Sequence, residues 1–394
     1  MPGTTAADLG RRIATIRHAR GLTQDQLATT ALVSPSTIRK IEQGRRAPSD
    51  DVLHAIATAL GTTPDHLLEG PGHTDSRVHA AIPAIRAVIA TYDLPDAVPL
   101  RPLGQLATAV QVVVGQRVNA EYARLTANIA PLLAELQYAV QQHNGADRQQ
   151  AATLLAATYR AADAAAYKHG HTDLSGRLVE LIRWAADIAE DPALRAAAAY
   201  VRTETFFASR ILPAGLRALQ TAIDDAPAPN TEQLQAAIGA LHMRAAVVAG
   251  RMHDPDTAHT HLAEAATLTT NIREGIYHGT AVGPDSLQIH RLAVAVELGD
   301  APGLNTAVRA ASTWQPPRDL PSERRSHYYI DLARAQMQLG RRQHARESLQ
   351  VARRIAPQHV REHGQVRAEL ATLVRLDRTR DEQLLAFARW ARAI

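Results

Sequence analysis

The segment from Ser34 to Arg46 combines a helix-start signal with polar and basic side chains. Serine at an N-cap and proline at the first helical position both favour a helix that begins at Pro35. Ile38 and Ile41 lie at helical spacing and would face a core, so the side chains between them would face solvent. The outward face would present Ser34, Pro35, Ser36, Thr37, Arg39 and Lys40. Such side chains fit the base edges and phosphates of a DNA major groove.

Positive charge in the first 70 residues is concentrated on this segment. Residues 1–70 hold eight Arg and Lys against seven Asp and Glu, so the region as a whole is nearly neutral. Residues 39–46 carry four of these bases, including Arg45 and Arg46, against one acid, Glu42. We therefore expect Arg45 and Arg46 to lie near a DNA phosphate.

Further short helices are predicted around this segment. Thr23 and Gln26 form a capping box that opens the preceding helix. Two short helices joined by a turn of three or four residues cross steeply, and the second then projects into a groove. Apolar spacing and glycine stops predict the other helices over residues 8–19, 49–60 and 63–68.

Three blocks at fixed spacing resemble the XRE, or Cro/repressor-type, helix-turn-helix family. They are Gly21-Leu22-Thr23-Gln24-x-Gln26-Leu27-Ala28, then Val33 to Pro48, then Leu53 to Gly61. The resemblance implies a five-helix DNA-binding domain over residues 1–69, in which Thr23 and Gln24 open the second helix against the DNA backbone. Two copies would bind a pseudo-palindromic double-stranded operator. The alternative, solvated faces of a small helical bundle, leaves the three spacings unexplained.

One position departs from the family pattern. Leu32 stands where the family usually has glycine, at a turn residue for which positive φ is easy. Leucine in that conformation would be strained, so we expect a rearranged turn within an intact fold.

Composition sets the class of the whole chain. The 394 residues are 46% hydrophobic but only 4% aromatic, and alanine dominates the apolar fraction, which favours close-packed helices over sheet. The absence of cysteine excludes disulfides, thiolate metal sites and thiol nucleophiles and suits a reducing cytoplasm. No secretory signal or apolar run of membrane-spanning length occurs, so we expect a cytoplasmic protein without membrane contact. A net charge of +4 is too small to indicate a partner.

A second region follows a predicted linker over residues 70–76, which is rich in glycine, proline and polar residues. Residues 77–394 show no alternating strand pattern, and long alanine-rich segments predict an all-α domain. Apolar offsets around Gly340 resemble those of a tetratricopeptide repeat and recur around Gly299, Arg210 and Gly170. Around Gly250 the second helix would be delayed by an insertion, Met252 to Asp256. These repeats predict a TPR-like α-solenoid.

The first helix of each pair would line the inner groove of such a solenoid. The predicted ligand-binding residues are Arg160, Tyr167, Tyr200, Glu204, Phe207, Arg244, Ile289, His327, Arg334 and Met337. Arginines can hold carboxylates in two-point contacts and aromatic rings can pack side chains, which suits an extended peptide. The alternative is that some of these residues fill the core between helices.

The combination of a repressor-type domain with degenerate TPR pairs resembles the peptide-responsive quorum-sensing regulators called RRNPP. That resemblance implies a homodimer whose DNA binding is controlled by a small peptide. Two alternatives remain open: a solenoid that docks a protein partner with no diffusible ligand, and a sensor of small molecules, which would need a closed apolar pocket.

No catalytic or cofactor motif is present, so neither an enzyme nor a bound cofactor is predicted. His253, Asp254, Asp256, His259 and His261 form the densest group of metal-ligand types, but half of them fall in a loop. His359 and His363 lie one turn apart, with only Glu362 nearby as an acidic third ligand. No metal site is therefore predicted.

Overall fold

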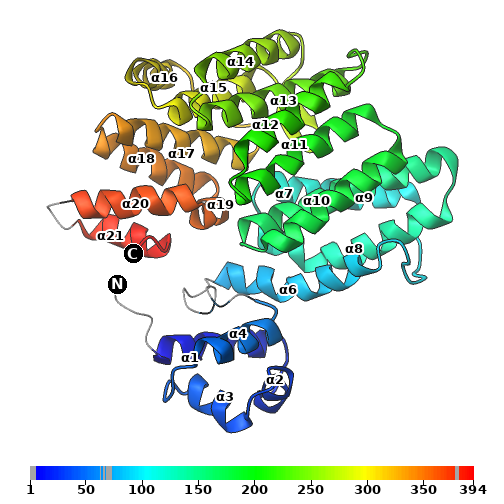
Figure 1. Ribbon diagram of the computed structural model, residues 1–394, viewed down its shortest axis with the longest axis vertical. Coiled ribbons are helices and arrows are strands. Elements are labelled where there is room, and N and C mark those ends of the chain that lie inside the picture. The colour runs from blue at the N-terminus through cyan, green and yellow to red at the C-terminus, as the bar shows by residue number, and fades with distance from the viewer. Residues whose placement is uncertain (1–5, 63, 65–66, 68–72, 378–380) are drawn as a thin grey trace. The chain divides into compact units, whose positions relative to one another are not determined.

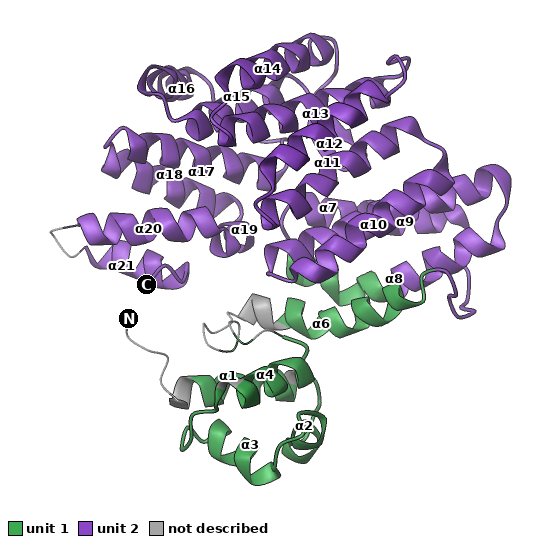
Figure 2. Ribbon diagram, viewed as in Figure 1, with its two compact units in different colours: residues 1–92, 122–130 green, residues 93–121, 131–394 purple. Residues whose placement is uncertain are grey.

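The computed structural model describes residues 6–62, 64, 67, 73–377 and 381–394. Helices dominate it, so the predicted all-α class is confirmed. The chain divides into two compact units (Figure 2), unit 1 with Met1–Tyr92 and Tyr122–Ala130 and unit 2 with Asp93–Glu121 and Pro131–Ile394. Among the described residues, no helix combines the length and apolar character that crossing a bilayer requires.

Unit 1 contains the predicted helix-turn-helix. Its helices are α1 (Ala6–Ala19), α2 (Gln24–Thr30), α3 (Pro35–Glu42), α4 (Asp50–Ala59) and α6 (His73–Ala90), and it includes the first part of α8 (Tyr122–Gln142). The capping box of Thr23 and Gln26 and the Ser34 cap of α3 are both formed. The predicted segment 63–68 and residues 70–72 of the predicted linker lie largely outside the described residues, and His73 already begins α6.

The core of unit 1 fixes α3 against α1. Leu9, Ile13, Leu27, Ile38 and Ile41 are all buried in one cluster, as their spacing predicts. A Cβ at Gly10 would lie 2.2 Å from the carbonyl oxygen of Ile41, so only glycine permits this approach of α1 to the end of α3.

The turn between α2 and α3 contradicts the expected rearrangement. Leu32 adopts the left-handed conformation itself, with φ 54°. The turn is closed by hydrogen bonds from Leu32 N to Thr29 O (3.2 Å) and from Val33 N to Ala28 O (3.0 Å). The Leu32 side chain is 93% exposed, so it meets no steric obstacle beyond its own backbone. The cap hydrogen bonds therefore hold a strained leucine where glycine would be relaxed.

Unit 2 is built from antiparallel helical pairs that follow one another in chain order (Figure 1). After α7 (Leu103–Val118) and the end of α8 come the pairs α9 (Gly145–Lys168) and α10 (Thr172–Ala189), α11 (Pro192–Ala208) and α12 (Leu212–Asp224), α13 (Glu232–Arg251) and α14 (Pro255–Thr269), α15 (Pro284–Leu298) and α16 (Ala301–Thr313), and α17 (Ser322–Gln338) and α18 (Arg342–Ile355). The last helices are α19 (Pro357–Glu362), α20 (Gly364–Leu376) and α21 (Glu382–Trp390). This is the predicted TPR-like arrangement.

A residue with positive φ lies in the turn of each pair. Gly170, Gly299 and Gly340 have φ of 78°, 74° and 73°, and Arg210 has 56°. In the third pair this residue is His253, with φ 55°, and not Gly250. The predicted insertion is therefore wrong: α13 continues to Arg251 and α14 begins at Pro255. Gly250 serves packing instead, since a Cβ there would lie 3.3 Å from the Cβ of Glu297 on α15.

A β-hairpin between α14 and α15 was not predicted. Its strands β1 (Gly275–Tyr277) and β2 (Thr280–Val282) pair antiparallel, with Tyr277 opposite Thr280. The two turn residues, His278 and Gly279, have φ of 43° and 77°. Positive φ at both positions is the geometry that a two-residue hairpin turn requires.

Replacing Leu32 by glycine is expected to stabilise the turn. Glycine removes the Cβ strain of the left-handed conformation, and after its greater freedom in the unfolded chain is subtracted, the free energy of local opening should rise by about 0.5–1 kcal/mol. Hydrogen exchange of the α2 and α3 amides in the full-length chain measures this free energy. Leu32→Ala is the control, since it shortens an exposed side chain but keeps the Cβ; equal protection in both variants would contradict the strain.

Candidate functional site

The first candidate surface is the outward face of α3 in unit 1. Ser34, Pro35, Ser36, Arg39 and Lys40 are exposed, and Thr37 is half-buried. Arg45, Arg46 and Thr23 are exposed, and Gln24 is half-buried. Every residue of the predicted DNA-contacting set thus lies at least partly on the surface.

Hydroxyl groups gather at the N-terminus of α3. The Ser34 Oγ lies 3.0 Å from the Ser36 Oγ and 2.8 Å from the Thr37 Oγ1, and it accepts the backbone N–H of Thr37 at 3.2 Å. Hydroxyls and free N–H groups at a helix N-terminus are donors that suit phosphate or base acceptors.

The single acid of α3 is occupied inside unit 1. Glu42 accepts hydrogen bonds from Arg17 Nε (2.7 Å) and Nη2 (3.0 Å), and from Gln24 Nε2 (2.7 Å). This pairing raises the pKa of Arg17 above its usual value. Glu42 therefore does not compensate the charge of Arg39 and Lys40, for which the described part of the chain offers no ion-pair partner.

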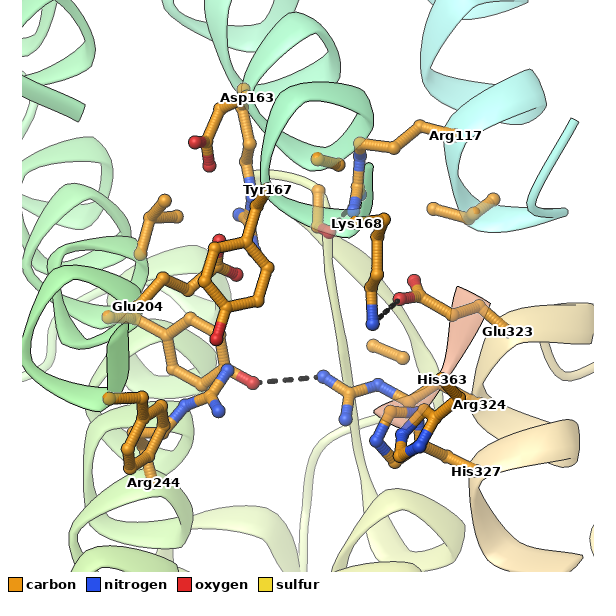
Figure 3. A pocket seen from close by; sticks show the side chains of 18 of the residues that line it. Arg117, Asp163, Tyr167, Lys168, Glu204, Arg244, Glu323, Arg324, His327 and His363 are labelled. Carbon is orange, nitrogen blue, oxygen red and sulfur yellow. Dashed lines mark hydrogen bonds and ion pairs between the residues drawn. The ribbon is translucent and has the colours of Figure 1, made fainter. Parts of the chain in front are cut away.

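The second candidate site is a cavity of about 540 Å³ within unit 2. Residues of α7, of the β-hairpin and of the start of α20 line it. The remaining wall comes mainly from α9, α11, α13 and α17, which are the first helices of four pairs (Figure 3). Its charged lining residues are the cations Arg117, Arg160, Lys168, Arg244, Arg251 and Arg324 and the acids Asp163, Glu204, Glu323 and Glu362.

The β-hairpin is held at the cavity wall by two buried arginines. Arg117 donates to the carbonyl oxygen of Gly279, and Arg160 donates to that of His278. Arg160 also donates to the Thr280 Oγ1 at 2.7 Å. Burial, and then the neighbouring Arg117, lowers the pKa of Arg160 to about 9.

Arginines also surround Tyr200 in the cavity wall. The Arg324 guanidinium donates to the Tyr200 hydroxyl at 3.0 Å, and that of Arg244 lies over the ring at 4.1 Å from its centroid. Although burial opposes ionisation, these cations lower the pKa of Tyr200 to about 8. The Arg251 guanidinium lies over the Phe207 ring at 4.5 Å from its centroid, so two of the three predicted aromatic rings, Tyr200 and Phe207, already contact cations.

Two acidic side chains of the cavity lining, Asp163 and Glu204, interact with each other. Asp163 is buried and accepts a hydrogen bond from the Ser175 Oγ at 2.6 Å. Burial, followed by the nearby carboxylate of Glu204, raises the pKa of Asp163 well above its usual value. Asp163 and Glu204 both point into the cavity beside Tyr167 (Figure 3).

Comparison with known proteins identifies the N-terminal region. Residues 8–69 match a family described as a helix-turn-helix domain. Transcriptional regulator ClgR of Mycobacterium tuberculosis is 35% identical over 96 residues, which make up 24% of this chain and 86% of that protein. The immunity repressor protein of Bacillus phage phi105 is 49% identical over 53 residues, 14% of this chain and 37% of that protein.

The chain belongs to the XRE-type helix-turn-helix transcriptional regulators. It is a DNA-binding regulator, as its sequence predicts. Among solved structures, Bacillus thuringiensis PlcR in complex with the peptide PapR7 and DNA is similar with 18% identity and a TM-score of 0.29, over 67% of this chain and 95% of that one.

Seven of the ten residues predicted to bind a ligand line the cavity of this XRE-type regulator. They are Arg160, Tyr167, Tyr200, Glu204, Phe207, Arg244 and His327. Ile289 is instead buried in a core between α15, α16 and α17. Arg334 pairs with Glu297 and Asp331, at 3.1 Å each, and Met337 packs against the C-terminal core.

Several lining residues of the regulator were missed from the sequence. Arg117 comes from α7, ahead of the repeats, and the hairpin contributes Ile276, Gly279 and Ala281. Glu323 and Arg324 lie one turn before His327 on the same helix, so helical spacing from His327 would have predicted them as lining residues. In the histidine-rich segment 253–261, Asp254 caps α14, and His261 Nδ1 lies 3.0 Å from the Nδ1 of His242 on α13.

The pKa of Tyr200 gives a pH-dependent prediction. Because the folded pKa is lowered to about 8, the phenolate stabilises the fold fully above the unfolded pKa of about 10, and this stabilisation is lost as the pH falls through 8. Tyrosinate absorbance of the folded regulator should show one residue ionising near pH 8, and Tyr200→Phe should abolish that step.

Tyr277→Phe is the matched control for this titration. Burial and a hydrogen bond to Glu232 raise the pKa of Tyr277 to about 12, so the step near pH 8 should persist in that variant. A step that survives in Tyr200→Phe would show that the arginines do not act on this hydroxyl.

Proposed function

We propose that this regulator binds a pseudo-palindromic double-stranded operator as a homodimer, in the cytoplasm, and that an anionic peptide bound in the unit 2 cavity controls its affinity for DNA. The observation that carries the effector proposal is the cavity lining, in which six cations face four acids. The DNA contacts are assigned to α3, with Thr23, Gln24, Arg45 and Arg46 beside it.

The exposed face of α3 supports the assignment of the DNA contacts. Its apolar residues Ile38 and Ile41 are buried, so the opposite face is free for a groove. Arg39 and Lys40 are exposed in the last turn of α3, and the Ser34 hydroxyl group caps the end that would lie nearest the bases. Gln24 donates one amide N–H to Glu42, which leaves its amide oxygen and its second N–H for a contact with DNA.

The effector argument rests on the chemistry of the cavity. A volume of about 540 Å³ falls within the range of about 300–1,000 Å³ that is usual for small ligand sites. Its wall is charged, whereas a sensor of apolar small molecules would need an apolar one. Arg244 and Arg324 are placed to receive a carboxylate, and guanidinium groups bind carboxylates with two parallel hydrogen bonds. A short peptide supplies such carboxylates at its C-terminus and in acidic side chains.

Replacing Arg39 and Lys40 by alanine together should weaken operator binding. Each side chain neutralises phosphate charge, so the slope of log affinity against log salt concentration should fall by about 2. Fluorescence anisotropy with operator DNA found by genome-wide mapping measures both quantities. Arg86→Ala on α6 removes another exposed cation and should leave the slope unchanged; an unchanged slope in the double variant would remove this face from the DNA contacts.

Replacing Arg244 by glutamine should weaken peptide binding in the full-length regulator. Loss of one charged hydrogen-bonding partner costs about 1.5–3 kcal/mol, or about 10–100-fold in affinity. Calorimetry with a library of short acidic peptides, each with a free or an amidated C-terminus, measures this change. Arg217→Gln, an exposed cation of α12, is the control.

The same titration separates the proposed effector from its alternative. A peptide that binds in the cavity should change operator affinity, and the change should shrink in Arg244→Gln. Saturable binding of a protein partner, with no response to any peptide of the library, would instead support a docking platform.

A further inference from the structure

Three histidines converge beside the cavity from parts of the chain that are far apart in sequence. His327 lies on α17, His359 on α19, and His363 follows α19 as its C-cap. One potential ligand nitrogen from each lies within 4.8 Å of the other two. Their ring centroids are 4.8 Å, 5.0 Å and 5.2 Å apart.

Nitrogen atoms of this cluster are buried without hydrogen-bond partners. His359 is 0% exposed, and neither its Nδ1 nor its Nε2 has a partner among the described residues. The same holds for His363 Nδ1 within the described chain. Burying an unsatisfied polar atom is costly, and a ligand that accepts the lone pair of one nitrogen on each ring would offset part of that cost.

We propose that His327, His359 and His363 form a binding site for a divalent transition-metal ion, with zinc as the ion that best fits it. Three imidazoles that bind one zinc ion at about 2.0–2.1 Å with tetrahedral angles have ring centroids about 5 Å apart, which matches the observed triangle. Imidazole donors suit zinc, copper, nickel and cobalt, whereas magnesium and calcium require oxygen ligands.

Glu323 lies beside the three histidines and would supply the fourth ligand after its side chain shifts toward the ion, since it is not among the atoms that lie within 4.8 Å of one another. Its Oε1 lies 3.8 Å from the His359 Nδ1, and it is one helical turn before His327 on α17. The same oxygen lies 3.6 Å from the Lys168 Nζ, so metal binding would draw this carboxylate away from the lysine. His327, His363 and Glu323 also line the cavity, which leaves room for a water or an anion at the metal.

The electrostatic surroundings both favour and oppose an ion at this position. Burial lowers the pKa of all three histidines well below its usual value, with the cation Lys168 contributing in each case. The imidazoles are therefore neutral at pH 7, which is the form that binds metals. Lys168 would also repel a bound metal ion. The negative charge of the Glu323 carboxylate offsets this repulsion.

The test uses full-length protein that has been freed of metal with a chelator and dialysed. Titration with Zn²⁺ by calorimetry should show one ion bound per chain, and Co²⁺ should give the intense visible absorption of a four-coordinate site. Zn²⁺ should raise the melting temperature, since an ion that binds only the folded state stabilises it. Mg²⁺ should do neither.

His327→Gln and His363→Gln should each lower Zn²⁺ affinity by more than about tenfold, because replacing even the outer partners of a metal ligand costs about 10–100-fold. His344→Gln, an exposed histidine of α18, is the matched control and should bind as the unsubstituted chain does. The fully buried His359 is left intact so that the fold is preserved.

Two results would overturn the site: no stoichiometric uptake of Zn²⁺ or Co²⁺ by the unsubstituted chain, or uptake that survives both substitutions while the control also binds. Neither result depends on a peptide or on DNA, so the metal site and the proposed regulation stand or fall separately.

Discussion

The fold depends on one backbone constraint, which is a residue in the left-handed conformation in the turn between α2 and α3 and in the turn within each helical pair of unit 2. Leu32 meets it between α2 and α3 in unit 1, and Arg210 and His253 meet it within helical pairs of unit 2. A single such residue ends a helix and reverses the chain within three or four residues. Short turns in unit 1 set the projection of α3, and those in unit 2 bring the first helices of successive pairs to one cavity. Both candidate surfaces therefore depend on turn residues, Leu32, Arg210 and His253, that are not part of them.

Much of this architecture could be predicted because glycine prefers that conformation. The sequence analysis places repeat origins at Gly170, Gly299 and Gly340, and in the structure each of them lies in the turn of a helical pair with positive φ. Gly250 misled the prediction because glycine also permits close helix packing, here of α13 against α15. The hairpin was not predicted because a strand of three residues is too short to show a recognisable alternation of apolar and polar residues between two helical segments.

The cavity could be predicted only where its wall follows a regular helix. Tyr200, Glu204 and Phe207 repeat at helical spacing on α11, so one register places all three. The same register gives wrong lining residues further along the solenoid. Ile289 of α15 is buried in the core, and Arg334 of α17 forms ion pairs within the protein. The three histidines could not be assembled from sequence because His327 joins the other two only through the packing of α17 with α19.

The charged side chains that line the cavity interact with one another electrostatically. Six cations gathered around four acids are costly to bury together, and this cost is visible in the pKa of Arg160, which is lowered to about 9 by burial and by Arg117. An anion in the cavity would relieve the repulsion among the cations, and its binding would therefore stabilise the arrangement of α9, α11, α13 and α17 that surrounds it. A metal ion on the histidines would add positive charge at the same wall and take Glu323 from Lys168. The metal ion would then strengthen the attraction of the cavity for an anion, so each ligand would raise the affinity of the protein for the other.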